Sequence, residues 1–99
     1  MQIDSNNPTD SELKFILFIS GMSLRSTHAM ENLRKIMDQY LPDAKLEIVD
    51  INIYRQKAAD YQIIAVPTLM RIYPLPVKMI LGDLSETQKV LRILDIKPE

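Results

Sequence analysis

The chain has 99 residues, enough for one domain with a modest core, and 46% of them are apolar and 25% charged, as in ordinary globular proteins. Twelve basic against thirteen acidic side chains leave a formal net charge of −1, which argues against nucleic acid as a partner, because such binding needs clustered basic residues. No apolar run is long enough to span a membrane, and the N-terminus is polar and acidic, unlike a signal peptide. The absence of cysteine excludes disulfides, thiolate nucleophiles and cysteine-bound metals. A soluble, cytoplasmic protein is expected.

Seven secondary-structure elements are predicted, after a flexible polar lead-in over residues 1–12 that precedes a single domain over 13–99. Short apolar runs rich in β-branched residues indicate strands, and apolar positions spaced by three and four indicate helices. In chain order the elements are a strand over 13–20, a helix from Ser26 or Thr27 to Tyr40, a strand over 46–51, a helix over 54–61, strands over 69–73 and 77–81, and a helix from Ser85 through Leu94. The order βαβαββα predicts an α/β fold.

The connections predict how the strands pair. A strand, a helix and a strand at the first spacing form a right-handed crossover unit, so strands 13–20 and 46–51 are expected to be parallel. Only residues 74–76 separate the last two strands, which is too short for a crossover and predicts an antiparallel hairpin. Ser85 and Gln88 have the spacing of a capping box at the start of the last helix.

Val66, Pro67 and Thr68 stand directly before the third strand, and this placement within the order βαβαββα resembles the thioredoxin arrangement. The resemblance implies a cis peptide bond at Pro67, beside the start of the first helix. Redox thioredoxins open that helix with a pair of cysteines, whereas residues 21–26 contain none. A thioredoxin-like frame without its redox pair predicts binding in place of redox chemistry.

Two longer segments carry a more specific resemblance. Residues 65–69 read Ala-Val-Pro-Thr-Leu, and residues 74–85 read Pro-Leu-Pro-Val-Lys-Met-Ile-Leu-Gly-Asp-Leu-Ser. With these segments in register, residues 13–96 resemble KaiB, a family of small thioredoxin-like proteins of the bacterial clock system. The resemblance implies a non-enzymatic protein that docks on KaiC, a RecA-like ATPase.

The same resemblance implies two folds for one sequence. The KaiB ground state is a tetramer ordered βαββααβ, the form expected in a crystal, whereas the thioredoxin-like state binds the partner. Residues 90–96, which become a strand in the ground state, are short and rich in β-branched side chains, so their pattern alone does not separate helix from strand. Candidate fold-switch residues are Gly82, Asp83, Ile93 and Asp95. A homo-oligomer, tetramer or dimer, is expected as the competing state.

Four residues are candidates for partner binding: Glu47, Arg71, Lys78 and Met79. Arg71 and Lys78 lie on adjacent predicted strands and are expected to form a small basic face. Met79, if exposed, adds to an apolar patch.

Four positions depart from the family pattern, and one of them is Met79, where the family tends to have a basic residue. His28 stands where the family has an arginine, Glu47 where it has a lysine that faces the partner, and Ile93 where it has a glycine. These departures make a stress or metabolic role through the ATPase an expectation equal to a role in a circadian rhythm.

No catalytic residue, cofactor or metal site is predicted. His28 is the only histidine, and Ser26 and Glu31 nearby in sequence do not make a catalytic triad. Asp50 and Asp83 stand at strand ends, where aspartate commonly serves turns. An alternative function is a KaiB-like sensor or adaptor module working with a histidine kinase. A thiol oxidoreductase, the enzymatic alternative, conflicts with the absence of cysteine.

Overall fold

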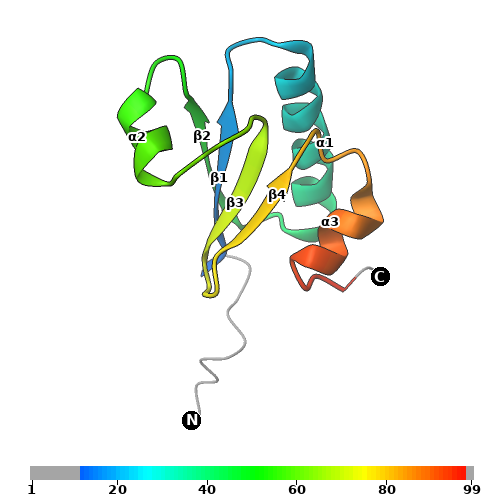
Figure 1. Cartoon of the computed structure of the whole chain (residues 1–99). Coiled ribbons are helices and arrows are strands. Elements are labelled where there is room, and N and C mark those ends of the chain that lie inside the picture. Colours follow the sequence, from blue (N-terminus) through cyan, green and yellow to red (C-terminus); the bar gives the residue numbers. More distant parts are fainter. Residues whose placement is uncertain (1–11, 98–99) are drawn as a thin grey trace.

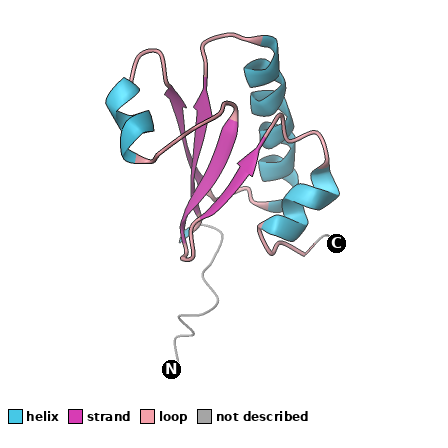
Figure 2. Cartoon of the chain, in the orientation of Figure 1, coloured by secondary structure: helices cyan, strands magenta, loops and turns pink. Residues whose placement is uncertain are grey.

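The computed structural model of the chain describes residues 12–97 (Figures 1 and 2). In chain order its elements are β1 (Lys14–Ile19), α1 (Leu24–Tyr40), β2 (Lys45–Asp50), α2 (Arg55–Asp60), β3 (Thr68–Tyr73), β4 (Lys78–Leu81) and α3 (Thr87–Ile93). This order is the predicted βαβαββα. Apart from Glu12, the lead-in expected over residues 1–12 lies outside the described part of the chain. The tetrameric order βαββααβ expected in a crystal stays a prediction.

The four strands form one mixed sheet in the order β2-β1-β3-β4. β1 pairs in parallel with β2 and antiparallel with β3, and β3 pairs antiparallel with β4. The predicted parallel crossover and the predicted antiparallel hairpin are therefore both confirmed. β2 and β4 are left at the two edges of the sheet (Figure 1).

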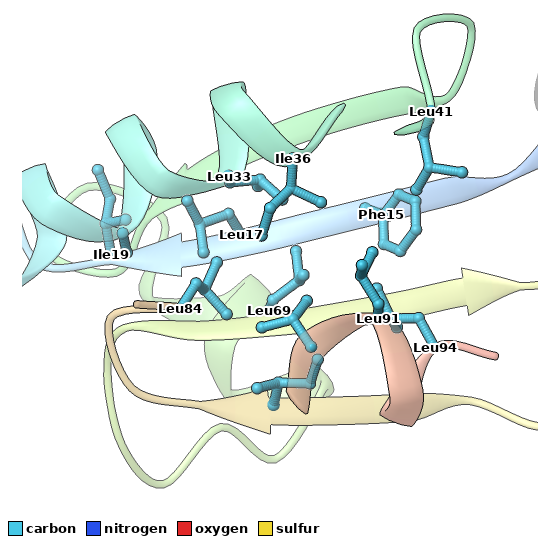
Figure 3. Close-up of a cluster of buried hydrophobic side chains, with 13 residues drawn as sticks. Phe15, Leu17, Ile19, Leu33, Ile36, Leu41, Leu69, Leu84, Leu91 and Leu94 are labelled. Carbon is cyan, nitrogen blue, oxygen red and sulfur yellow. The ribbon is translucent and has the colours of Figure 1, made fainter. Parts of the chain in front are cut away.

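Helices α1 and α3 cover one face of the sheet (Figure 2). Strand side chains alternate between faces, so every second residue of β1 points into this cluster. The buried side chains of the cluster, most of them drawn in Figure 3, are Phe15, Leu17, Ile19, Ala29, Leu33, Ile36, Leu41, Leu69, Ile80, Leu84, Val90, Leu91 and Leu94. Burying each large apolar side chain contributes about 1.5–3 kcal/mol, so this cluster supplies most of the driving force for folding.

A smaller cluster lies on the opposite face, beneath the chain that leaves α2. Ile16 and Phe18 of β1 are its centre, and the ring of Tyr61 packs on Phe18 with ring centroids 5.7 Å apart and tilted by 56°. Helix α2 has no buried residue of its own. The residues that follow α2, and not the helix itself, therefore pack against this face of the sheet.

Helix α1 begins at Leu24, two or three residues earlier than predicted. Its N-cap is Ser23, whose hydroxyl accepts a hydrogen bond from the backbone N–H of Ser26 at 3.2 Å. Ser26 is buried inside the helix, and its own hydroxyl accepts the backbone N–H of Ser20 at 3.1 Å. Ser26 thus joins the end of β1 to α1 instead of capping the helix.

The capping box predicted at the start of α3 is wrong. The N-cap is Glu86, and its side chain makes no capping hydrogen bond. The backbone N–H of Ser85 donates to the carboxylate of Asp83 at 3.1 Å. Ser85 therefore belongs to a turn that precedes the helix, and the polar spacing seen in the sequence reflects that turn.

Candidate functional site

The structure separates the four partner-binding candidates onto the two faces of the sheet. Residues directly opposite one another in neighbouring strands point to the same face. One row across the four strands consists of Glu47, Ile16, Met70 and Met79. Arg71 and Lys78 are opposite each other in the neighbouring row, on the face that carries α1 and α3. The candidates therefore do not form one patch in this fold.

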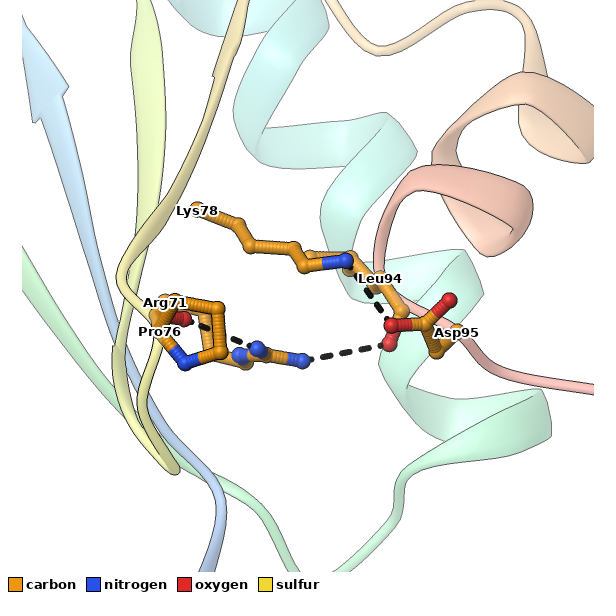
Figure 4. A network of polar contacts seen from close by, with 5 residues as sticks. All are labelled: Arg71, Pro76, Lys78, Leu94 and Asp95. Carbon is orange, nitrogen blue, oxygen red and sulfur yellow. Dashed lines mark hydrogen bonds and ion pairs between the residues drawn. The ribbon is translucent and has the colours of Figure 1, made fainter.

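Arg71 is buried, with 6% of its surface exposed, and holds two segments together (Figure 4). Its Nη2 donates to the carbonyl of Pro76 in the hairpin at 2.9 Å, and its Nη1 donates to the carbonyl of Leu94 at the end of α3 at 3.3 Å. A positive charge at the C-terminus of a helix is favourable because the helix dipole is negative there. Within residues 12–97, Nε has no hydrogen-bond partner. The basic face expected from Arg71 and Lys78 is therefore corrected. Arg71 is two residues from Leu69 in β3, so its side chain points to the same buried face and holds the hairpin to the end of α3.

Lys78 continues this network toward solvent. Its ammonium group forms an ion pair with the carboxylate of Asp95 at 2.8 Å (Figure 4). This hydrogen bond is the main cause that lowers the pKa of Asp95 below its ordinary value. Ile93, which precedes Leu94 and Asp95 in the sequence, is partly buried and packs against the large core cluster. We call Arg71, Pro76, Lys78, Leu94 and Asp95 the C-terminal latch.

Replacing Asp95 with asparagine should destabilise the protein in a pH-dependent manner. Asparagine tolerates the positive φ of 59° at this position, so the substitution removes mainly the charge. A lowered pKa in the folded state stabilises the protein fully above the unfolded pKa, and this contribution is lost as the pH falls through the folded value. Urea unfolding from pH 3 to 7 should therefore show a difference between wild type and Asp95→Asn that is largest near neutral pH and shrinks progressively as the pH falls below about 4.

The control for this prediction is the same substitution in a Lys78→Met background. Without the ammonium group, Asp95→Asn should produce almost no pH-dependent difference. If wild type and Asp95→Asn differ in free energy of unfolding by the same amount at every pH down to 3, the ion pair contributes nothing to the latch.

Gly82, Asp83 and Pro67 meet at the opposite end of β4. The peptide bond between Val66 and Pro67 is cis, which agrees with the cis-proline expected there. Gly82 has a φ of 113°, which favours glycine, and its N–H donates to the carbonyl of Pro67 at 2.9 Å. The carbonyl of Asp83 accepts a hydrogen bond from Asn32 of α1 at 2.8 Å. This turn therefore joins β3, β4 and α1.

Asp83 is also held by its side chain. Hydrogen bonds from Ser85 are the largest cause that lowers the pKa of Asp83, followed by smaller contributions from the charges of Arg25 and His28. Asp83 thus serves as a turn carboxylate, the ordinary role expected of it. The two fold-switch candidates at this turn and the two in or beside α3 bracket the segment 84–92.

Glu47 and Met79 are the exposed candidates. Glu47 lies on β2 and accepts a hydrogen bond from Lys57 of α2 at 2.6 Å, which raises the pKa of Lys57. Met79 is 39% exposed and Leu81, two residues along the same strand face, is 55% exposed. Met79 therefore contributes to an apolar strip along β4, as expected for an exposed residue there.

Ser26, His28 and Asp50, the residues considered for catalysis, are found in structural contacts or at the surface. Between Glu12 and Lys97, no group of three or more histidine, aspartate or glutamate side chains is placed to hold a metal ion. The Ser26 hydroxyl is buried in a backbone contact, and His28 lies exposed on α1. Asp50 accepts the N–H of Asn52 at 2.9 Å and closes a turn. Within the same part of the chain, no helix is long and apolar enough to cross a membrane.

Sequence reasoning missed the role of Leu94 and Pro76, whose backbone carbonyls accept hydrogen bonds from the guanidinium group of Arg71. Part of the signal was present, because Leu69 and Arg71 are two residues apart in a strand and therefore share a face. An arginine directed into a core needs acceptors. Which carbonyls supply them depends on how α3 packs, and the sequence pattern does not contain that information.

Solved structures similar to this chain include several thioredoxins. Thioredoxin of Fasciola hepatica matches with a TM-score of 0.71 and 19% identity, covering 88% of this chain and 83% of its own. Chloroplastic thioredoxin z matches with a TM-score of 0.71 and 14% identity, covering 86% of this chain and 78% of its own. At these identities the likeness establishes the fold alone, which is thioredoxin-like.

Sequence comparison is more specific. Residues 16–96 match the family model described as the KaiB domain. The circadian clock protein KaiB3 of Synechocystis sp. is 42% identical over 84 residues, which are 84% of this chain and 82% of that protein. The circadian clock oscillator protein KaiB of Synechococcus elongatus is 36% identical over 81 residues, which are 81% of this chain and 79% of that protein. The chain belongs to the KaiB family.

Proposed function

We propose that this protein is a clock-type regulatory protein without catalytic activity, which docks on a KaiC-like RecA-type ATPase. The observation that carries the proposal is a thioredoxin-like frame that has no cysteine at the start of its first helix and exposes apolar side chains in that segment. Met22 and Leu24, at the start of α1, are 81% and 71% exposed. Exposed apolar side chains that lie beside a rigid turn are suited to burial against a partner. The family relationship supplies the kind of partner.

Of the four proposed docking residues, Glu47 and Met79 are exposed on one face of the sheet, while Arg71 and Lys78, on the other face, hold the end of α3. The charge of Glu47 is opposite to the lysine expected in the family. With His28 and Ile93, this reversal supports an output in stress or metabolic regulation through the ATPase.

The proposal includes a second fold, adopted in a self-associated state. Leu84 and Asp95, on either side of α3, have φ values of 64° and 59°. The left-handed conformation costs a non-glycine residue roughly 1–2 kcal/mol, and aspartate tolerates it better than leucine. Strain at both ends of α3 supports an alternative arrangement of residues 84–96. Backbone chemical shifts of residues 50–96 at low and high concentration test it, and one concentration-independent βαβαββα pattern would overturn it.

Docking is tested by retention of the full chain on an immobilised, purified KaiC-like ATPase with ATP, a non-hydrolysable analogue, ADP or no nucleotide. Wild type should be retained in at least one nucleotide state. Met79→Ser should weaken retention about fivefold, the effect of losing roughly 1 kcal/mol of contact. Gln39→Ser, an exposed position on α1, is the matched control and should be retained like wild type. Absence of retention under every nucleotide condition would refute the proposal.

A further inference from the structure

Methionines are the side chains of this protein that are most open to mild oxidation. The chain has no cysteine and no tryptophan, but it has six methionines. A thioether sulfur takes up one oxygen atom to become a sulfoxide, and it does so faster where solvent reaches it. Exposure therefore decides which of the methionines reacts first.

The methionines in the described part of the chain differ widely in exposure. Met22 is 81% exposed, Met79 is 39% exposed and Met70 is 3% exposed. Met30 and Met37 are partly buried and pack against the large core cluster. Among the methionines between Glu12 and Lys97, Met22 is therefore the one that an oxidant in solution reaches most easily.

A hydrogen-bonded turn holds Met22 at the surface. The N–H of Ser23 donates to the carbonyl of Ser20 at 3.3 Å, so Gly21 and Met22 are the central residues of the turn. Gly21 has a φ of 52°, which favours glycine. The side-chain amide of Asn52 donates to the hydroxyl of Ser20 at 3.1 Å and ties the turn to the segment after β2. Because these contacts fix the backbone around Met22, its side chain stays outside the core.

We propose that Met22 is an oxidation site, at which hydroperoxides such as hydrogen peroxide form the sulfoxide selectively and reversibly. The sulfur lone pair attacks one peroxide oxygen, so an S–O bond forms while the O–O bond breaks. The electron pair of the O–O bond leaves with the second oxygen as hydroxide, which takes the proton of the first oxygen and becomes water. The sulfur is oxidised by two electrons, and the peroxide is reduced by the same two electrons.

The reverse step needs a reductant. A methionine sulfoxide reductase returns the sulfoxide to the thioether with two electrons from a dithiol, which becomes a disulfide, and the oxygen leaves as water. Such an enzyme has to reach the side chain. An exposed turn gives it access to Met22 while the rest of the protein stays folded.

Oxidation at this site changes the surface and leaves the core intact. Met22 and Leu24 are the exposed apolar side chains at the start of α1. A sulfoxide is polar and its oxygen accepts hydrogen bonds, so this surface becomes less apolar while no packed side chain is lost. The consequence for docking rests on the proposed function: the oxidised surface should bind the ATPase more weakly.

Peptide mapping of the folded full chain after graded treatment with hydrogen peroxide tests the site. Trypsin cleaves after lysine and arginine, which places each of the six methionines in a different peptide, so mass spectrometry follows them separately. Met22 should be oxidised about tenfold faster than Met70 and about twice as fast as Met79. Purified methionine sulfoxide reductases with dithiothreitol should return the Met22 peptide to its unoxidised mass. The proposal is overturned if Met22 reacts no faster than Met30 and Met37, or if its sulfoxide is not reduced.

Met22→Leu and the matched control Met30→Leu separate this site from the other methionines. At a peroxide dose that fully oxidises Met22, wild type should elute earlier from a hydrophobic-interaction column, while its urea midpoint stays unchanged. Met30→Leu should shift like wild type, and Met22→Leu should show less than about a third of that shift. An equal shift in Met22→Leu, or a lowered urea midpoint of oxidised wild type, would overturn the proposal, because the reactive methionine would then lie elsewhere.

Retention on the immobilised ATPase tests the consequence for docking. Oxidised wild type should be retained about threefold more weakly than untreated wild type, and the reductases should restore retention. Retention of Met22→Leu, whatever its level before treatment, should not change with peroxide. Equal retention of oxidised and untreated wild type would overturn this consequence. If untreated wild type is not retained in any nucleotide state, the proposed function fails, and the peptide map still decides the oxidation site.

Discussion

Replacing Arg71 with alanine is expected to lower the free energy of unfolding by about 3 kcal/mol, the largest effect of any change in the C-terminal latch. The substitution leaves the carbonyls of Pro76 and Leu94 without their donors and opens a gap where the buried side chain packed. Losing a charge-assisted hydrogen bond costs more than losing a neutral one. Urea unfolding followed by circular dichroism measures the change.

Arg71→Met separates the two contributions. Methionine fills much of the space of the arginine stem but donates nothing, so it should recover roughly half of the loss. Lys78→Ala, which removes only the exposed pair with Asp95, should have a much smaller effect, because solvent screens that pair. An Arg71→Ala protein within about 1 kcal/mol of wild type would mean that the buried guanidinium does not hold α3 to the hairpin.

Replacing Leu91 with alanine is expected to cost about 3 kcal/mol. Leu91 is 1% exposed and belongs to the large core cluster, to which α3 contributes its inner face. The truncation removes buried apolar surface and leaves a cavity that neighbours fill only in part. Urea unfolding measures the loss of free energy. Since α3 is short, hydrogen exchange of its backbone amides should also accelerate more than exchange in β1.

Gln88→Ala is the matched control, because Gln88 is exposed on the same helix. Its effect on the free energy of unfolding should stay within about 0.5 kcal/mol. Equal effects of the two substitutions would indicate that helix propensity, and not packing on the sheet, keeps α3 in place. Uniform acceleration of exchange across the sheet would show that α3 and the strands unfold as one unit.

Local pattern was sufficient where one short segment contains all the information. The run before Gly21 predicted β1, and the short link over residues 74–76 predicted the antiparallel hairpin, whereas the cis peptide bond at Pro67 was implied by the resemblance to thioredoxin. Alternation and loop length are properties of neighbouring residues, so they are readable without the rest of the molecule.

The prediction of helix caps failed where two nearby residues are both able to cap the same helix. Ser23 and Ser26 are both able to cap α1, and the choice depends on the buried contact that Ser26 makes with Ser20. Ser85 has the spacing of a capping residue, yet its N–H is taken by Asp83. In both places a side chain from the preceding turn or strand end decides, and its position follows from the packing of the sheet.

The sequence by itself determined the element order, the absence of thiol chemistry and the resemblance to KaiB, because composition and spacing are independent of how distant segments meet. Only the tertiary structure decided that Arg71 is buried beneath the end of α3, and that Glu47 and Met79 end one row on the opposite face. It also placed β2, with Lys45 and Glu47, at a free edge. These outcomes depend on strand order and register, which long-range packing sets and no single segment encodes.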